Sequence, residues 1–280
     1  MTIEALRVAP DLERRFGGLQ RLYGRTGAER IRASHVAVVG IGGVGSWAVE
    51  ALARSGVGHL TLIDLDHIAE SNVNRQIHAI DSTLGQAKVQ AMRDRIAQIN
   101  AACVVTCVED FVQPDNWPAL LAEPVDAVID ACDQVHAKVA IAAWGLARCV
   151  NAPSAVQPIV LGVGAAGGKR QAYRVDIEDL SLVTHDPLLA QVRRRLRKEH
   201  GAAGVGQPIG LACVFSREPV VRPDTVAESS QHPAGVQILD SAGNDSTLNC
   251  RGYGSVVSVT ATFGLCAAGW VLDQLARQAA

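Results

Sequence analysis

Short apolar runs rich in Val and Ile alternate with amphipathic stretches along the first 165 residues of the chain. The runs have the length and composition of buried strands, and the stretches between them carry apolar residues at helical spacing. The predicted strands cover residues 35–40, 60–64, 104–108, 127–130 and 159–162, and the predicted helices cover residues 46–55, 86–99 and 135–148. Because strands that alternate with helices are joined by crossovers and run parallel, this pattern predicts a doubly wound α/β sheet of Rossmann type.

The second half of the chain follows a looser pattern. A strand is predicted at residues 171–175 and a charged helix at residues 187–200, before a stretch rich in Gly, Pro and Ser. Residues 252–272 carry no charge and approach the length of a membrane span. Glycines and hydroxyl-bearing residues interrupt them, so we expect a buried strand followed by a buried helix there, and no membrane association.

A glycine-rich loop follows the first predicted strand. Its glycines are Gly40, Gly42, Gly43 and Gly45, and a helix is predicted to start directly after them. Glycines at this point allow a tight turn and a close backbone approach, so that the amides at the helix start can hold phosphate. Asp64 ends the next predicted strand, where an acid can bind ribose hydroxyls. The loop alone leaves open whether the ligand is NAD, FAD or ATP.

Charged residues beyond the loop separate these ligands. Arg75 and Lys88 carry charges that a dinucleotide oxidoreductase does not need at this place. An enzyme that cleaves ATP does need them, because charge develops on the triphosphate as pyrophosphate leaves. Asp66 or Asp133 can hold Mg²⁺ through carboxylate oxygen. The sequence therefore predicts ATP and Mg²⁺ as cofactors, with Arg75, Lys88 and Asp133 as the catalytic residues.

These motifs resemble the ubiquitin-activating-enzyme-like adenylation superfamily, which includes the bacterial activators for molybdopterin and thiamine biosynthesis. The resemblance implies that Asp64, Asn72, Arg75, Lys88 and Asp133 line the site for ATP and Mg²⁺. The matching strings are Gly-Ile-Gly-Gly-Val-Gly-Ser from Gly40, Leu-Ile-Asp-Leu-Asp from Leu62, Ser-Asn-Val-Asn-Arg-Gln from Ser71, Gly-Gln-Ala-Lys from Gly85 and Asp-Ala-Cys-Asp from Asp130.

A narrower resemblance, to the tRNA threonylcarbamoyladenosine dehydratases, covers nearly the whole chain. The matching strings are Arg-Phe-Gly-Gly from Arg15, Arg-Leu-Tyr-Gly from Arg21, Asn-Arg-Gln-Ile-His-Ala from Asn74, Asp-Phe-Val from Asp110, His-Asp-Pro-Leu from His185, Cys-Val-Phe-Ser from Cys213 and Val-Thr-Ala-Thr-Phe-Gly from Val259. The resemblance implies ATP-dependent cyclisation of the threonylcarbamoyl modification beside the tRNA anticodon, through adenylation of the threonyl carboxylate.

The same resemblance implies a homodimer in which Arg15 or Arg21 reaches the ATP of the partner. It also implies an alkali-metal ion held by main-chain carbonyls, and the chain departs from the family pattern nearby, where Lys169 and Arg170 follow the glycine-rich residues 162–168. These two charges can alter contacts to the substrate or to an ion.

The resemblance also suggests a division of the chain into parts. Residues 1–34 are interpreted as a helical lead-in and residues 35–280 as a single adenylation domain. Within the domain, about residues 35–165 are expected to bind the nucleotide, and about residues 166–280 the substrate and the dimer partner.

Net charge gives no global attraction to RNA, because the formal value is −2. A tRNA substrate therefore needs a local basic patch, and the charged helix supplies the strongest one; its members are Arg193, Arg194, Arg195, Arg197 and Lys198. A solvated helix face is the alternative interpretation of such a run.

The seven cysteines are irregularly spaced and include no Cys-x-x-Cys pair. This pattern favours free thiols in a reducing cytoplasm and predicts no zinc site. Cys250, beside Arg251, is a candidate nucleophile that a cysteine desulfurase or another sulfur-transfer partner could load, although ring closure itself requires none.

Two rival functions stay open. An adenylyltransferase that activates the C-terminus of a ubiquitin-like sulfur carrier uses the same ATP site, but such enzymes commonly carry paired Cys-x-x-Cys zinc ligands. A nucleotide-binding scaffold without turnover has no need for the full set of charged residues.

Overall fold

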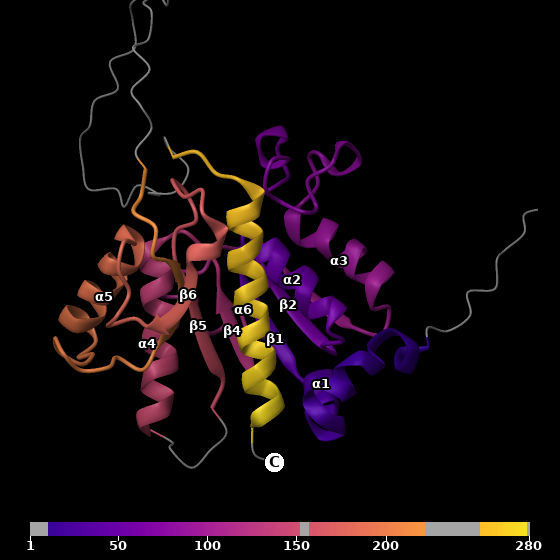
Figure 1. Ribbon diagram of the computed structural model, residues 1–280, viewed down its shortest axis with the longest axis horizontal. Coiled ribbons are helices and arrows are strands. Elements are labelled where there is room, and N and C mark those ends of the chain that lie inside the picture. The colour runs from indigo at the N-terminus through magenta and orange to yellow at the C-terminus, as the bar shows by residue number, and fades with distance from the viewer. Residues whose placement is uncertain (1–10, 152–156, 222–252, 279–280) are drawn as a thin grey trace, which may run out of the picture.

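The computed structural model describes residues 11–151, 157–221 and 253–278 of the protein. Its centre is a seven-stranded sheet with the strand order β3-β2-β1-β4-β5-β7-β6 (Figure 1). The strands are β1 His35–Val39, β2 His59–Ile63, β3 Val104–Val108, β4 Ala127–Asp130, β5 Ile159–Val163, β6 Val175–Asp179 and β7 Ala212–Ser216. All neighbouring strands pair in parallel except β6 and β7, which are antiparallel.

Helices cover both faces of the sheet, and the side chains of β1 show why. Val36 and Val38 pack into a core with α2, α3 and α6, whereas Ala37 and Val39 face the core on the α4 side. The helices are α1 Leu12–Ala33, α2 Gly45–Arg54, α3 Lys88–Ile99, α4 Val135–Asn151, α5 Pro187–Glu199 and α6 Val257–Arg277. The sheet is therefore doubly wound, as the alternation of strands and helices predicted.

Two expectations for the second half of the chain are wrong. Residues 172–174 form a short 3-10 helix, so the strand expected at 171–175 begins only at Val175. Strand β7 was not expected at all, because it lies within the stretch described as rich in Gly, Pro and Ser. Strand β7 lies between β5 and β6, and three of its residues, Cys213, Val214 and Phe215, are fully buried. A short apolar run in such a buried position forms a strand.

The Val- and Thr-rich half of the C-terminal segment is helical, and not the strand expected there. Helix α6 begins at Val257 and lies beside α2 across the sheet (Figure 1). Val259, Thr260 and Phe263 are buried on one face of this helix. Burial at helical spacing thus overrides the preference of β-branched residues for strands. Helix α6 is long and apolar enough to cross a membrane, but half of its apolar window is buried inside the protein, as in a core helix.

Helix α1 is more than a polar lead-in. Phe16, Ala28 and Ile31 are buried, and the helix is kinked at Gly24, whose φ is 71°. A side chain at Gly27 would contact Ala276 of α6, so α1 packs closely against the last helix. The division of the chain at residue 35 stays a prediction.

We predict opposite effects for two glycines of α6. A methyl group at Gly264 would come within 2.8 Å of the Ala48 amide nitrogen and overlap the Val44 carbonyl, whereas one at Gly269 meets nothing within 4 Å. Gly264→Ala should therefore lower the free energy of unfolding by about 2 kcal/mol or more. Gly269→Ala should leave it unchanged or raise it, since Ala favours a helix. Urea unfolding of both variants measures this difference, and equal values would contradict the close packing of α2 and α6.

Candidate nucleotide-binding and adenylation site

A cavity of about 470 Å³ lies at the carboxyl edge of the sheet, where the loops after β1, β2, β4 and β5 meet. It brings together most of the residues that the sequence predicted for a nucleotide site: Gly40, Gly42, Gly43, Asp64, Asp66, Asn72, Arg75, Lys88 and Asp133. Gly45 does not line it. A side chain at Gly45 would overlap the Gly40 carbonyl oxygen, so this glycine allows the turn instead of facing a ligand.

Glycine is required at position 40 because two loops approach closely there. Its φ is 83°, and a Cβ atom would lie 2.8 Å from the nitrogen of Cys132 in the loop after β4. Helix α2 starts directly beyond the loop, and its N-cap residue Val44 offers no side-chain cap to the first amides. The amides of Ser46 and Trp47 donate to the carbonyls of Gly42 and Val44, so the glycine loop before them and the positive end of the helix dipole are what suit this end of the cavity to phosphate.

Asp64 ties the loop after β1 to the loop after β2. Its carboxylate accepts hydrogen bonds from the backbone N–H of Ile41 at 2.6 Å and of Asp66 at 2.8 Å. Burial raises the pKa of Asp64, and the charge of Lys88 and these hydrogen bonds oppose that rise. The carboxylate is thus fixed at the cavity wall in the place that a ribose-binding acid requires.

Lys88 is the first residue of α3 and is buried at the cavity wall, with 6% of its surface exposed. Its Nζ atom lies 2.6 Å from the Asp66 carboxylate and 3.8 Å from that of Asp64. A triphosphate in the cavity would therefore meet an ammonium group that two carboxylates already hold in place. Such preorganised charge is what stabilises a departing pyrophosphate.

Arg75 lies across the glycine loop. A Cβ atom at Gly43 would be 3.2 Å from its Cδ atom, and its Nη1 donates to the Ser71 carbonyl at 2.7 Å. The Trp47 indole of α2 donates to the Arg75 carbonyl at 2.9 Å. Asn72 has a local role, since its side-chain oxygen accepts the Ala69 N–H. The structure thus places Arg75 beside the glycine loop of the cavity and Asn72 in the turn that carries it.

A buried ion pair that the sequence analysis missed lies beneath the loop after β4. Lys138 of α4 is 1% exposed, and its Nζ lies 3.1 Å from the Asp130 carboxylate and donates to the Asp130 carbonyl at 3.0 Å. The same carboxylate oxygen accepts the N–H and the thiol of Cys132. Burial and this carboxylate raise the pKa of the Cys132 thiol, so it stays protonated and serves packing. The sequence did contain a signal for this ion pair, because Lys138 stands alone among the apolar residues of a predicted helix.

A family model supplies the comparison that decides the family. The model described as the ThiF family matches residues 14–278. The chain belongs to the ThiF family.

Two bacterial relatives of this ThiF-family chain match over nearly their full length. It is 38% identical over 280 residues to the tRNA threonylcarbamoyladenosine dehydratase of Haemophilus influenzae, covering 99% of each chain. It is 40% identical over 270 residues to the Escherichia coli protein of the same name, covering 95% of each. The crystal structure of the E. coli dehydratase in complex with ATP matches with a TM-score of 0.79 at 38% identity, covering 96% of each chain.

Several predicted residues lie away from the cavity of this ThiF-family chain. The basic residues of α5 are separate from it, on the far side of α4 (Figure 1). Arg193 donates to the carbonyls of Leu180 and Val183, which explains one of these charges by packing. His185 is exposed and acts through its backbone, which adopts a φ of 55°. Cys250, the candidate nucleophile, lies outside the described residues.

One group of side chains in the described part of the chain has the spacing of a metal site, at the opposite edge of the sheet. His35, His59 and Glu123 bring ligand atoms within 4.8 Å of one another. The two imidazole rings stack at 3.6 Å, and both ring nitrogens of His35 contact protein oxygens, of Pro124 and Thr61. The stacking and these contacts explain the two histidines as packed core residues. The expectation that the protein binds no zinc stays a prediction.

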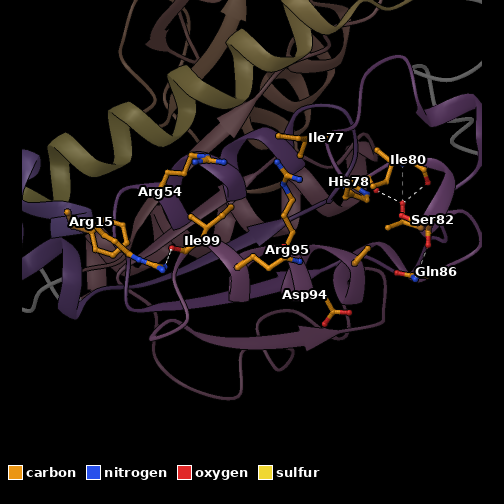
Figure 2. A pocket seen from close by; sticks show the side chains of 14 residues that line it. Arg15, Arg54, Ile77, His78, Ile80, Ser82, Gln86, Asp94, Arg95 and Ile99 are labelled. Carbon is orange, nitrogen blue, oxygen red and sulfur yellow. Dashed lines mark hydrogen bonds between the residues drawn. The ribbon is translucent and has the colours of Figure 1, made fainter. Parts of the chain in front are cut away.

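A second cavity, of about 770 Å³, opens between α1, α2 and α3. Figure 2 shows Arg15 at one end, His78 at the other, and Arg54 and Arg95 between them. Arg15 donates to the Ile99 carbonyl at 2.7 Å, so it is held at the end of α3 in its own chain. His78 is 3% exposed, and neither ring nitrogen has a hydrogen-bond partner. Burial, with the charges of Lys88 and Arg95, lowers the pKa of His78 to about 4.

We predict that His78 makes the fold sensitive to acid. The pKa of His78 is about 4 in the folded chain and 6.5 in the unfolded chain. As the pH falls below 6.5, the unfolded chain therefore binds a proton before the folded chain does, and the free energy of unfolding decreases. Between about pH 7 and about pH 5, the wild type should lose about 2 kcal/mol more unfolding free energy than His78→Gln. Urea unfolding at both pH values measures the loss. The exposed His200→Gln should behave as the wild type, and an equal pH response of His78→Gln would contradict the assignment.

Proposed function

We propose that this chain catalyses the ATP-dependent dehydration of N6-threonylcarbamoyladenosine in tRNA, by adenylating the threonyl carboxylate so that the modification closes into its cyclic form. The observation that carries the proposal is the cavity that joins the glycine loop to Asp64, Arg75 and Lys88 at one edge of the sheet. The near full-length similarity to dehydratases supports the substrate. The similarity to a dehydratase crystallised with ATP supports the second substrate.

Adenylation solves a defined chemical problem. A carboxylate resists nucleophilic attack because its leaving group would be oxide. In the proposed reaction a carboxylate oxygen attacks the α-phosphorus of ATP and pyrophosphate leaves. The carbamoyl group of the same side chain then attacks the activated carbonyl, and AMP leaves with one carboxylate oxygen. Since both reacting groups belong to one molecule, ring closure costs little entropy and needs no nucleophile from the protein.

Several charged residues of the cavity have a role in the proposed reaction. The glycine loop and the positive end of the α2 dipole hold the phosphates, and Asp64 accepts hydrogen bonds from the ribose. Lys88 and Arg75 stabilise the charge that develops on pyrophosphate. Mg²⁺ fits this end of the cavity, because Asp133 and Asp66 offer the oxygen ligands that it prefers. When bound, the ion neutralises phosphate charge. An alkali-metal ion would need main-chain carbonyl ligands; one converging group of these already holds the ammonium group of Lys169.

The proposed homodimer has support from the outward side of α6. Val257 and Leu265 are exposed there, and a second copy would cover them. Of the two arginines considered for the partner's ATP, Arg21 is the better candidate, since it is exposed while Arg15 is bound to its own chain. A cytoplasmic location and a sulfur-transfer partner that uses Cys250 stay proposals from the sequence alone.

Two residues of α5 are the best candidates for tRNA contacts. Arg195 pairs with Glu199, and Arg197 donates to the carbonyls of Ala203 and Gly204, so these two charges have protein partners. Arg194 and Lys198 are exposed one helical turn apart and point to the same side. We propose that they contact phosphates of the tRNA backbone.

Loss of either cavity cation should slow the reaction. We expect Arg75→Ala and Lys88→Ala each to reduce the single-turnover rate by about 100-fold. The assay uses tRNA that carries threonylcarbamoyladenosine, with ATP and Mg²⁺, and follows the loss of one water from the nucleoside by mass. Arg93→Ala, an exposed position of the same helix α3, should react as the wild type.

An unchanged nucleoside mass would contradict the proposal. If the protein instead exchanged pyrophosphate in the presence of a small carrier protein ending in Gly-Gly, the adenylyltransferase function would replace it. Wild-type rates in both variants would remove Arg75 and Lys88 from the chemistry.

The α5 contacts predict a change in salt dependence. In the double variant Arg194→Ala/Lys198→Ala, the slope of log affinity for tRNA against log salt concentration should become shallower by about 1 to 2, since each lost phosphate contact removes a little less than one unit. The control is Arg25→Ala/Arg277→Ala, which removes two exposed arginines elsewhere. An equal change in slope in the control would show that only net charge matters, and would contradict the assigned contacts.

A further inference from the structure

Three main-chain carbonyls converge on one buried ammonium group beside the nucleotide cavity. Lys169 is 1% exposed, and its Nζ donates to the carbonyls of His185 at 2.8 Å, Glu218 at 2.6 Å and Ser216 at 3.4 Å. An ammonium group has three N–H donors, so the three acceptors match its charged form. These carbonyls come from the loop before α5, from the last residue of β7 and from the segment just after β7.

Two buried carboxylates add negative charge around the same point. Asp186 is 4% exposed and accepts the N–H groups of Ala165 and Leu189. Glu218 is 5% exposed and accepts those of Arg170 and Gln171. Burial lowers the pKa of Lys169, and the charges of Asp186 and Glu218 oppose that effect. An uncompensated charge inside a protein is costly, so this place requires a cation.

Carbonyl oxygens in such an arrangement are also the ligands that replace the hydration shell of potassium. We propose that the carbonyls of His185, Ser216 and Glu218 form a monovalent-cation site that this chain fills permanently with its own Lys169 ammonium group, in place of a bound potassium or ammonium ion. The inference is independent of the proposed reaction, since it concerns how the wall of the cavity is held. It also explains the role of Lys169, which departs from the family pattern.

The cation site holds the cavity wall that β5 leads into. Gly164, Ala166 and Gly167 line the cavity and lie two to five residues before Lys169. A side chain at Gly164 would overlap the Asp186 carboxylate, so this segment lies directly on the charged group. Removal of the ammonium group should therefore weaken ATP binding as well as the fold.

The experiment replaces the tethered cation by a free one. In Lys169→Ala the space of the side chain is open, so potassium and water can enter; in Lys169→Met the chain fills the stem and leaves no room for an ion. In choline chloride, both variants should lose about 10 °C in Tm, which is what an uncompensated buried charge implies for a chain of this size. Potassium chloride at equal ionic strength should restore at least half of the loss in Lys169→Ala, with saturation, and little in Lys169→Met.

The wild type and Arg170→Ala, which removes the exposed neighbouring charge, should show the same Tm in both salts to within about 2 °C. The affinity of Lys169→Ala for ATP, measured by calorimetry, should change in the same direction as its Tm: it should fall in choline chloride and recover in potassium chloride. A Lys169→Ala protein that is as unstable in potassium as in choline, or that folds in neither, contradicts the proposal. A wild type that itself needs potassium contradicts it too. Neither readout requires turnover of tRNA, so the proposed function can fail separately.

Discussion

The close approach of the loops after β1 and β4 is the constraint on which the site depends. At Gly40 the two backbones come so near that no side chain fits between them. The loop after β4 is held in that position from below by the buried pair of Asp130 and Lys138. The crossover connections of the sheet bring the carboxyl ends of the central strands to one edge, and the cavity forms where the chain order changes direction between β1 and β4.

Cationic and anionic side chains lie together at that edge of the sheet, and the cations remain able to interact with a bound nucleotide. Lys88 is buried against Asp64 and Asp66, and Arg75 is held across the glycine loop by the Ser71 carbonyl and the Asn74 side-chain oxygen. A nucleotide therefore meets groups whose positions are set before it binds, which is the condition for electrostatic catalysis. The same principle recurs beyond the wall formed after β5, where Lys169 holds carbonyls from distant segments near two buried carboxylates.

The sequence predicted the nucleotide half of the molecule well because its signals are local. The apolar runs and the glycine loop follow from spacing alone, and Asp64, Arg75 and Lys88 lie in continuous motifs. The errors occurred where tertiary packing decides the outcome. Val257 to Thr260 prefer a strand locally, but the burial of Val259 and Thr260 at helical spacing makes the segment helical. The role of Lys169 could not be predicted, because the carbonyls that it holds lie 16 to 49 residues away and only the fold brings them together.

The central claim is that this edge of the sheet transfers AMP to the threonyl carboxylate of the modified tRNA. Oxygen-18 in that carboxylate traces the step directly, because AMP must leave with one of its oxygens. The measurement is the mass of the nucleotide released in a single turnover with labelled tRNA and unlabelled ATP. The account predicts AMP that carries one oxygen-18 atom, together with unlabelled pyrophosphate. Unlabelled AMP, or label found in inorganic phosphate released with ADP, would contradict it.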